Sequence, residues 1–589
     1  MKTRPEKLKR IYTGIGMFLF PIVHFYLLEA YTHSGFSMVR PWSQLFNIVL
    51  YELLMLILFF LFRNLKWALR AEGIAAMIIG IINYYVYTFR SLPLVPWDFL
   101  SIETALSVAD NYNFMPSIRV VLVVLGFLII LFAEGFCDLE LKEWKWYQSL
   151  FSVISVCIVI TGFSHVLQQE DFQNRHRMYN KLFTPVRVWQ INGFALTMVM
   201  ELPYLTVEKP KGYEAKEAKE ILADYEPKSA EAKKPNIIVM MNEAFSDLAV
   251  LGEFSANEEY MPYFHKLWSG GENTISGYLH VSVCGGNTAN TEFEFLTGNT
   301  MAFLPWGSVP YQQYIHKKIP ALPSYLKKLG YQTYAMHPYH ASGWDRDTVY
   351  PLMGFEHTEF LPDYLYREYI RDYVSDRTCV EKIIDTYEEK DADAPAFIFN
   401  VTMQNHGSYG DAYANFTPDI TVEGVKSFSL STYLSLIKET DKALKVLLDY
   451  FSAVDEPVIV CFFGDHQPND TVAQPILRLN GMSYQSLTEE QTDLRYQVPY
   501  LIWANYDIKE QTNEDTSANY LAAKMLEAAG MELPSYQQFL LELSQSYPVL
   551  SAQRLENAKG ESKDLDDEEE EILHTYQKLQ YYQLFSIQD

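Results

Sequence analysis

Apolar residues crowd into the first 170 positions, where they form five long runs separated by short polar stretches. The runs are Ile11–Glu29, Leu45–Phe62, Ile74–Phe89, Val120–Phe136 and Leu150–Val166. Each run is near the length that an α-helix needs to cross a bilayer. Tryptophans fall at several of their ends, as interfacial aromatic residues do. The pattern predicts a domain of five transmembrane helices in residues 1–166.

Charge next to these runs predicts their orientation. The segment Met1–Arg10 carries five basic residues and one acid, and Arg63, Lys66 and Arg70 follow the second run. Positive residues favour the cytoplasmic side of a membrane. The N-terminus is therefore expected in the cytoplasm, and five spans place everything after them outside the cell. The loop Asp138–Lys145 is not net positive and gives this orientation no support.

Four features near the membrane receive modest interpretations. His24 and Glu52 lie within apolar runs but are single and unpatterned, so a packing or interfacial role is favoured over a transport path. The loop Leu92–Ile102 suits an external segment at the interface, and Phe194–Leu202 reads as a helix lying on the membrane. Residues 167–235 are expected to form a juxtamembrane segment and a solvated linker.

After residue 235 the pattern changes to short apolar runs that alternate with helical stretches. The expected buried strands are Ile237–Met241, Thr333–Met336, Ala396–Thr402, Val458–Phe463 and Tyr500–Trp503, and the expected helices include Ile319–Leu329, Ser431–Phe451 and Ser517–Ala529. Such alternation predicts an α/β domain with a largely parallel sheet, here in residues 236–545. An acidic, partly helical tail is expected in residues 546–589, around the run Asp564–Glu571.

Composition excludes several classes of protein. The net charge of −26 argues against nucleic acid as the main partner. The five cysteines show no paired spacing, so neither a disulfide framework nor a cysteine zinc site is indicated.

One loop, Cys284–Gly298, combines a Gly-Gly pair with a hydroxyl at an expected helix start. The glycines allow a close bend of the backbone, and Thr288 would lie beside free N–H groups at the positive end of a helix dipole. Such a position suits a bound phosphate. Taken alone, the loop is also compatible with an ordinary turn and helix cap.

Polar residues at four strand ends strengthen the case for a site. Glu243 ends one strand, Asp465 and His466 end another, and His337 and His406 follow two more. Ligands bind beyond the carboxyl ends of strands in open α/β sheets, and buried acids need compensation. Glu243, Asp465, His466 and the Thr288 oxygen make a mainly oxygen set, which suits Mn²⁺ or Mg²⁺ and also allows Zn²⁺.

The motifs together resemble the lipoteichoic acid synthase-type phosphoglycerol transferases of the alkaline phosphatase/sulfatase superfamily. They are Asn236–Asp247, the Thr288 loop, Trp344–Tyr350, Gln404–His406 and Gly464–His466, and the plan of five spans before an external domain matches too. The resemblance implies a sulfatase-like fold for the α/β domain.

The resemblance also implies roles for the matching residues. Glu243, Thr288, Asp465 and His466 would hold a divalent metal, usually manganese or magnesium, with Thr288 as the nucleophile. The residues expected to contact glycerophosphate are His337, Trp344, Arg346 and His406. Arg346 suits a bidentate phosphate contact, and the imidazoles could pass a proton to the departing alcohol.

The sequence departs from the family in the nucleophile loop. Asn287 stands where better-known members have a lysine, which removes one positive charge near the phosphate. A sulfatase would need Cys-x-Pro-x-Arg, whereas Cys284 is followed by Gly-Gly-Asn-Thr, so sulfatase activity is not expected.

The predicted function is therefore transfer of glycerol phosphate from phosphatidylglycerol to a glycolipid anchor or a growing polyglycerolphosphate chain, through a phosphothreonine at Thr288. The expected location is the cell membrane, with membrane lipid as donor. The alternatives are transfer of phosphoethanolamine, release of glycerophosphate to water, and a non-catalytic membrane protein that binds cell-wall polymer.

Overall fold

The structure is a computed structural model that describes residues 4–33, 35–90, 93–99, 114–179, 185–202, 206–225, 233–305, 307–483, 487–560 and 567–587. The chain divides into two compact units. One, the helical unit, holds most of the residues before 208, and the other, the sheet unit, holds most of those after it.

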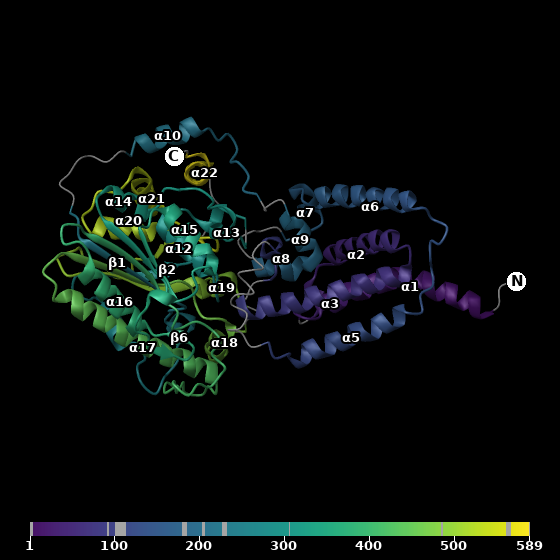
Figure 1. The fold of residues 1–589 in the computed structure, drawn as a ribbon, viewed down its shortest axis with the longest axis horizontal. Helices are drawn as coiled ribbons and strands as arrows, with labels where there is room; N and C mark the ends of the chain where they lie inside the picture. Colours follow the sequence, from purple (N-terminus) through teal and green to yellow (C-terminus); the bar gives the residue numbers. More distant parts are fainter. Residues whose placement is uncertain are drawn as a thin grey trace. The chain divides into compact units, whose positions relative to one another are not determined.

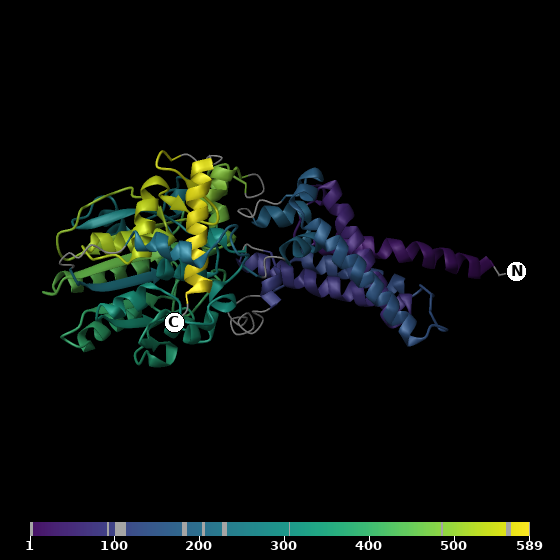
Figure 2. The ribbon, with the colours of Figure 1, turned by 90° about the horizontal axis from the view of Figure 1, so that it is seen from above.

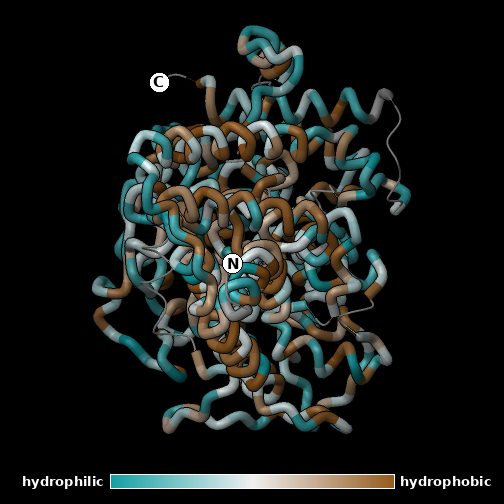
Figure 3. The backbone as a smooth tube through the Cα atoms, turned by 90° about the vertical axis from the view of Figure 1, so that its right-hand side faces the viewer, coloured by the Kyte–Doolittle hydropathy of each residue, from teal (hydrophilic) through white to brown (hydrophobic). Residues whose placement is uncertain are grey.

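All five apolar runs of the helical unit are helices. They are α1 (Arg4–Glu29), α2 (Pro41–Phe62), α3 (Leu65–Arg90), α5 (Ile118–Glu134) and α6 (Trp146–Leu167). Figure 3 shows their hydrophobic residues as brown stretches of the chain around the N-terminus. Among the described residues, three helical segments are long and apolar enough to cross a membrane: Glu6–Glu29, Pro41–Phe62 and Trp146–Leu167. The count of five spans stays a prediction.

Three shorter helices complete the described part of this unit: α7 (Glu170–Arg175), α8 (Pro185–Asn192) and α9 (Phe194–Glu201). Helix α9 forms where an amphipathic helix was expected. Its Leu196 and Met200 are buried in a cluster with Leu50 of α2 and Leu167 of α6, so α9 packs into the helical unit. The loop expected at Leu92–Ile102 lies partly outside the described residues.

An eight-stranded sheet forms the centre of the other unit. Its order is β10 (Thr516–Ser517), β2 (Thr274–His280), β9 (Gln497–Ala504), β8 (Val458–Gly464), β1 (Asn236–Asn242), β7 (Ala396–Val401), β3 (Gln332–Met336) and β4 (His357–Glu359). Every pairing is parallel except the two made by β9. The largely parallel sheet is therefore confirmed. All residues of β1, β7 and β8 are buried, which explains their continuous apolar sequences.

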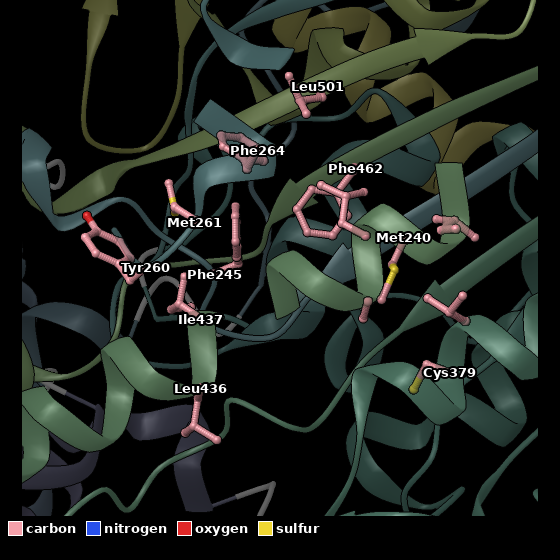
Figure 4. Close-up of a cluster of buried hydrophobic side chains, with 14 of the residues drawn as sticks. Met240, Phe245, Tyr260, Met261, Phe264, Cys379, Leu436, Ile437, Phe462 and Leu501 are labelled. Carbon is pink, nitrogen blue, oxygen red and sulfur yellow. The ribbon is translucent and has the colours of Figure 1, made fainter. Parts of the chain in front are cut away.

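Helices cover both faces of the sheet (Figure 1). Helices α16 (Asp376–Glu389) and α17 (Phe428–Ser452) pack on the face that carries Met240 and Phe462. Figure 4 shows Phe245, Phe264 and Phe462 in this cluster. On the other face, Phe295 of α12 (Thr288–Thr297) stacks on Phe399 and contacts Phe463.

The remaining helices lie around this core. They are α11 (Pro262–Trp268), α13 (Pro310–Gln313), α14 (Leu322–Lys328), α15 (Arg346–Met353), α18 (Asp470–Leu479), α19 (Glu489–Asp493), α20 (Ala518–Ala528) and α21 (Ser535–Ser546). Two small hairpins pair β5 (Tyr369–Ile370) with β6 (Tyr373–Val374) and β11 (Val549–Leu550) with β12 (Leu555–Glu556).

The end of the chain packs into the same unit. The acidic run begins helix α22 (Asp567–Tyr581), although its first residues, 564–566, lie outside the described part. Tyr576 and Leu579 are fully buried in a cluster with Tyr213 and with Ala218 of α10 (Ala215–Ala223). Figure 2 shows α22 as the yellow helix beside α10. The described parts of the expected linker and tail thus share a core with the sheet unit.

Candidate active site

Four neighbouring parallel strands bring the predicted strand-end residues to one edge. The strands lie in the order β8, β1, β7, β3, and Asn242 at the end of β1 is in register with Gly464 at the end of β8. Glu243 and Asp465, the next residues, are therefore neighbours. Thr402 begins the segment that leads from β7 to His406, and its hydroxyl accepts a hydrogen bond from the Glu243 N–H at 3.1 Å.

The Cys284–Gly298 loop has an unusual backbone that explains its glycines. Gly285, Gly286 and Asn287 have φ values of 72°, 154° and 65° in succession. Glycine tolerates positive φ freely and asparagine better than most residues. The turn ends at Asn287, which caps α12, so Thr288 is the first helical residue, as the sequence predicted. The Thr288 hydroxyl lies 3.3 Å from Glu243 Oε2, to which it donates a hydrogen bond.

Glu243, Asp465 and His466 form a compact, buried cluster. One ligand atom from each lies within 4.8 Å of the others. His466 Nε2 is 3.2 Å from Asp465 Oδ2 and 3.7 Å from Glu243 Oε1. Asp465 Oδ2 and His466 Nε2 have no hydrogen-bond partner among the described residues. Buried atoms of this kind normally have partners, so their donor set fits a divalent metal ion.

The charges of the cluster also favour a bound metal ion. Burial, followed by repulsion from Asp465, raises the pKa of Glu243 well above its usual range, and burial also raises the pKa of Asp465. Two carboxylates so close together and so buried are stable in their charged forms when a cation lies between them.

Backbone contacts fix the cluster from behind. The N–H groups of Ala244 and His466 donate to Asp465 Oδ1 at 2.7 and 2.8 Å. These bonds turn the other oxygen, Oδ2, toward His466. Gly464 has no room for a side chain, because a Cβ there would lie 1.9 Å from the carbonyl oxygen of Phe245. The chain reversals after β1 and β8 are thus packed against each other.

Arg346 lies in the same region with a partner that the sequence reading missed. Its Nε donates to Glu292 at 3.1 Å, and its Nη2 also bonds to Glu292. The hydroxyl of Tyr350 donates to Glu292 at 2.7 Å. This side of the guanidinium, which would form a bidentate phosphate contact, is therefore taken by Glu292. Arg346 Nη1 faces His337 Nε2 at 3.1 Å.

Glu292 follows Thr288 by four residues, so both lie on one face of α12. That spacing could have suggested Glu292 as a site residue. Burial lowers the pKa of Arg346, but Glu292, Tyr350 and Tyr311 together raise it above its usual value, so the guanidinium stays charged.

The two predicted imidazoles are neutral in this setting. His337 donates from Nδ1 to the carbonyl of Val401 at 3.0 Å, and burial together with Arg346 lowers its pKa well below the usual range. His406 donates from Nδ1 to the carbonyl of Gly407 at 2.7 Å, and burial lowers its pKa to about 4. Each therefore presents Nε2 as a hydrogen-bond acceptor, and that of His337 already faces Arg346 Nη1.

A second group of residues that the sequence reading missed holds the His406 loop. Arg371 donates to the carbonyls of Gln404 and His406 at 2.8 and 2.7 Å, and the Tyr373 hydroxyl lies 3.0 Å from His406 Nδ1. Trp344, the remaining predicted residue, is partly buried two positions before Arg346 and has a left-handed backbone with φ 59°.

Comparisons with known proteins show which family the chain belongs to. The sulfatase family profile matches residues 235–531. A protein of Rhizobium meliloti (strain 1021) named for cyclic beta-1,2-glucan modification is 31% identical over 84% of this chain and 77% of its own length. The chain belongs to the sulfatase family.

This sulfatase-family chain is also similar to a lipoteichoic acid synthase and to a phosphoglycerol transferase. Lipoteichoic acid synthase 1 of Bacillus subtilis (strain 168) is 23% identical over 46% of the chain and 42% of its own length. The solved structure of a Streptococcus pyogenes phosphoglycerol transferase with sn-glycerol-1-phosphate has a TM-score of 0.53 and 22% identity, and it covers 65% of this chain and 100% of its own. The latter shows a shared fold. The expected membership of the alkaline phosphatase/sulfatase superfamily is confirmed.

Proposed function

We propose that the chain is a phosphotransferase that moves glycerol phosphate from phosphatidylglycerol to a cell-surface acceptor. The observation that carries the proposal is the Thr288 hydroxyl, placed at the start of α12 and 3.3 Å from a carboxylate of the buried acid–imidazole cluster. A hydroxyl so placed suits a nucleophile. The absence of Cys-x-Pro-x-Arg at Cys284 argues against sulfatase chemistry.

Glu243, Asp465, His466 and the Thr288 oxygen would hold the metal. The oxygen-rich set with one imidazole favours Mn²⁺, and it also suits Mg²⁺ or Zn²⁺. When bound, such an ion lowers the pKa of a coordinated hydroxyl and offsets charge on phosphate oxygens.

The first step forms a bond between Thr288 Oγ1 and phosphorus. The bond from phosphorus to the diacylglycerol oxygen breaks, and the threonine proton ends on that departing oxygen. Arg346 Nη1, Trp344 and His337 would contact the glycerophosphoryl group. Because the Glu292 side of the guanidinium is occupied, Arg346 would bind phosphate from its Nη1 side.

The second step reverses the first with a new alcohol. An acceptor hydroxyl forms a bond to phosphorus, the bond to Thr288 Oγ1 breaks, and threonine regains a proton. His406 is neutral and can take the acceptor's proton at Nε2.

The acceptor that we propose is a carbohydrate hydroxyl of the cell surface, on a glucan or glycolipid, or the end of a growing polyglycerolphosphate chain. The relative named for glucan modification supports a carbohydrate acceptor, since it matches most of this chain. The helical unit would anchor the enzyme in the cell membrane, which the three apolar helices support. The sheet unit would lie outside the cell.

Mass spectrometry of Thr288 tests the nucleophile and the donor together. Full-length protein in lipid nanodiscs would be incubated with labelled phosphatidylglycerol or labelled phosphatidylethanolamine. We expect a glycerophosphoryl adduct on Thr288 from the first lipid, and none in the Thr288→Ala variant. Thr297→Ala, at the far end of the same helix, is the matched control and should keep the adduct.

Three outcomes would contradict parts of the proposal. An adduct from phosphatidylethanolamine alone would replace the donor with another lipid. Turnover without any adduct on Thr288 would remove the nucleophile. Full polymer synthesis by Thr288→Ala in cells would favour a non-catalytic role, and glycerophosphate released equally with and without acceptor would indicate hydrolysis.

A further inference from the structure

The sequence suggested that His24 is an isolated polar residue. In the helical unit, however, it lies between two carboxylates. Its Nδ1 is 3.1 Å from Glu72 Oε2, and its Nε2 is 2.7 Å from Glu134 Oε1. The three side chains come from α3, α1 and α5, and each is 0% exposed. This arrangement was not evident from the sequence, because Glu72 and Glu134 stand at the ends of apolar stretches, where charged residues usually face the interface.

The packing of the helices is adapted to the imidazole. A Cβ on Gly73, the residue after Glu72, would lie 2.8 Å from His24 Nε2. Glycine at this position therefore lets α3 approach the histidine closely. The opposite side of the ring lies near Phe127 of α5, with centroids 6.3 Å apart and the planes stacked. The imidazole is thus enclosed by helix, aromatic ring and two acids.

The charges of this group do not balance. Two carboxylates and one imidazolium sum to −1. Within the described helices neither acid has another ion-pair partner, and Glu72 Oε1 and Glu134 Oε2 lack a hydrogen-bond partner there. A buried net charge is costly in a helical unit of this kind. One more proton makes the group neutral.

A neighbouring pair at the C-terminal end of α1 shows the contrast. Glu29 Oε2 lies 3.0 Å from His33 Nδ1, and its Oε1 accepts from the N–H of Phe194 at 2.7 Å. One carboxylate and one imidazolium balance in that pair, so it needs no additional proton.

We propose that His24, Glu72 and Glu134 form a proton-binding site inside the helical unit, which at rest holds an imidazolium, one carboxylic acid and one carboxylate and exchanges the proton of the acid with water. The exchange route that we infer is a groove that begins one residue after Glu134. Its lining is Leu8, Lys9, Tyr12, Lys66, Gly135, Phe136, Cys137 and Asp138. The side chains of Lys9 and Asp138 in this groove are each 54% exposed, so water reaches it.

The other titratable groups around the site come from every helix packed against it. Tyr51 and Glu52 of α2 interact electrostatically with Glu72. Tyr12 of α1 and Cys137 after α5 interact with Glu134. Arg70 of α3 donates its Nε to the carbonyl of Leu131 at 3.2 Å and makes no described ion pair with either acid. None of these groups supplies the missing positive charge.

Infrared spectroscopy of the full-length protein in lipid nanodiscs tests the site. A protonated carboxylic acid gives a C=O stretching band that carboxylates lack and that shifts in D₂O. Subtracting a variant's spectrum from the wild-type spectrum removes bands from all other buried acids. We expect the difference to show loss of one such band in Glu72→Gln or Glu134→Gln near neutral pH. Glu29→Gln, the matched control, should show no loss.

Two results would overturn the proposal: the same band intensity in the wild type and in both glutamine variants, or loss of the band in Glu29→Gln alone. Thermal unfolding of each variant checks that it is folded. Should the glutamine variants fail to fold, Glu72→Asp and Glu134→Asp keep the charge and should shift the band. Unshifted bands in both aspartate variants would count equally against a proton-binding site. Because this readout does not involve transfer, its result is independent of the proposed function.

Discussion

Two buried glutamates near Thr288, Glu243 and Glu292, differ in what surrounds their charge. Glu292 is bonded to Arg346 from two nitrogens and accepts from Tyr350. Glu243 accepts a hydrogen bond from the Thr288 hydroxyl, and its N–H donates to Thr402. Its other neighbour is a second acid, Asp465. The first charge is satisfied by the protein and the second is not. The difference indicates that a cation would bind beside Glu243, whereas Glu292 belongs to the structure that supports the site.

Glu243→Gln should have the largest effect. We expect transfer to fall by at least about 100-fold, because the variant loses a metal ligand. Without metal, the same variant should unfold at a higher temperature than the wild type, since one of two repelling acids is gone. Calorimetry with chelator and with Mn²⁺ measures both effects. A variant that kept metal-dependent stabilisation would break the contrast with Glu292.

Glu292→Gln should destabilise the protein itself. Breaking a buried ion pair costs about 3–5 kcal/mol because the remaining charge is left without a partner. Chemical denaturation of the sheet unit within the full chain measures this loss, which should not depend on metal. The double variant Glu292→Gln/Arg346→Gln should regain part of the stability, whereas equal loss in both would show that the ion pair itself matters little.

Glu294 provides a third case, a buried acid held by neutral donors. It accepts from the Ser282 hydroxyl and the Met301 N–H, both at 2.8 Å, and burial raises its pKa to about 7. The folded state therefore holds this proton more tightly than the unfolded state. Its contribution to stability is complete below the ordinary glutamate pKa and is lost as the pH rises toward 7, with a slope of at most about 1.4 kcal/mol per pH unit. Glu294→Gln should remove that slope, and an unchanged pH profile would contradict the assignment.

Tyr350→Phe should have the smallest effect. It removes one of the hydroxyls bonded to Glu292 while Arg346 stays in place. A hydrogen bond to a charged group contributes about 1.5–3 kcal/mol. Urea unfolding measures the change, and Tyr339→Phe is the control at a nearby tyrosine outside this ion pair. A loss as large as that of Glu292→Gln would mean that Tyr350, rather than Arg346, is the main partner.

Strand-end chemistry was predictable from the sequence because parallel strands end at one edge. The positions of the strands alone place Glu243, Asp465 and His466 together. The strands themselves were recognisable in the sequence as buried apolar runs. The helix that begins at Thr288 was predicted for a similarly local reason.

Long-range pairing was not predictable in the same way. Strand β2, with a glycine at its centre, and the two-residue β10 have too weak a pattern to be recognised. Glu292 resembled a solvent-facing charge on a helix, since its partner Arg346 is 54 residues away. His24 resembled an isolated residue because its two acids stand on other helices. In each case the missing information was a contact between distant segments.

The left-handed turn Gly285–Asn287 limits how this enzyme could be redesigned. A side chain at Gly285 would add roughly 1–2 kcal/mol of backbone strain, and a lysine at position 287 would meet a similar penalty that asparagine largely avoids. Replacing Asn287 with lysine alone would therefore weaken the turn that precedes Thr288. A combinatorial library aimed at new donor head groups would do better to keep 285–288 fixed and to vary Trp344.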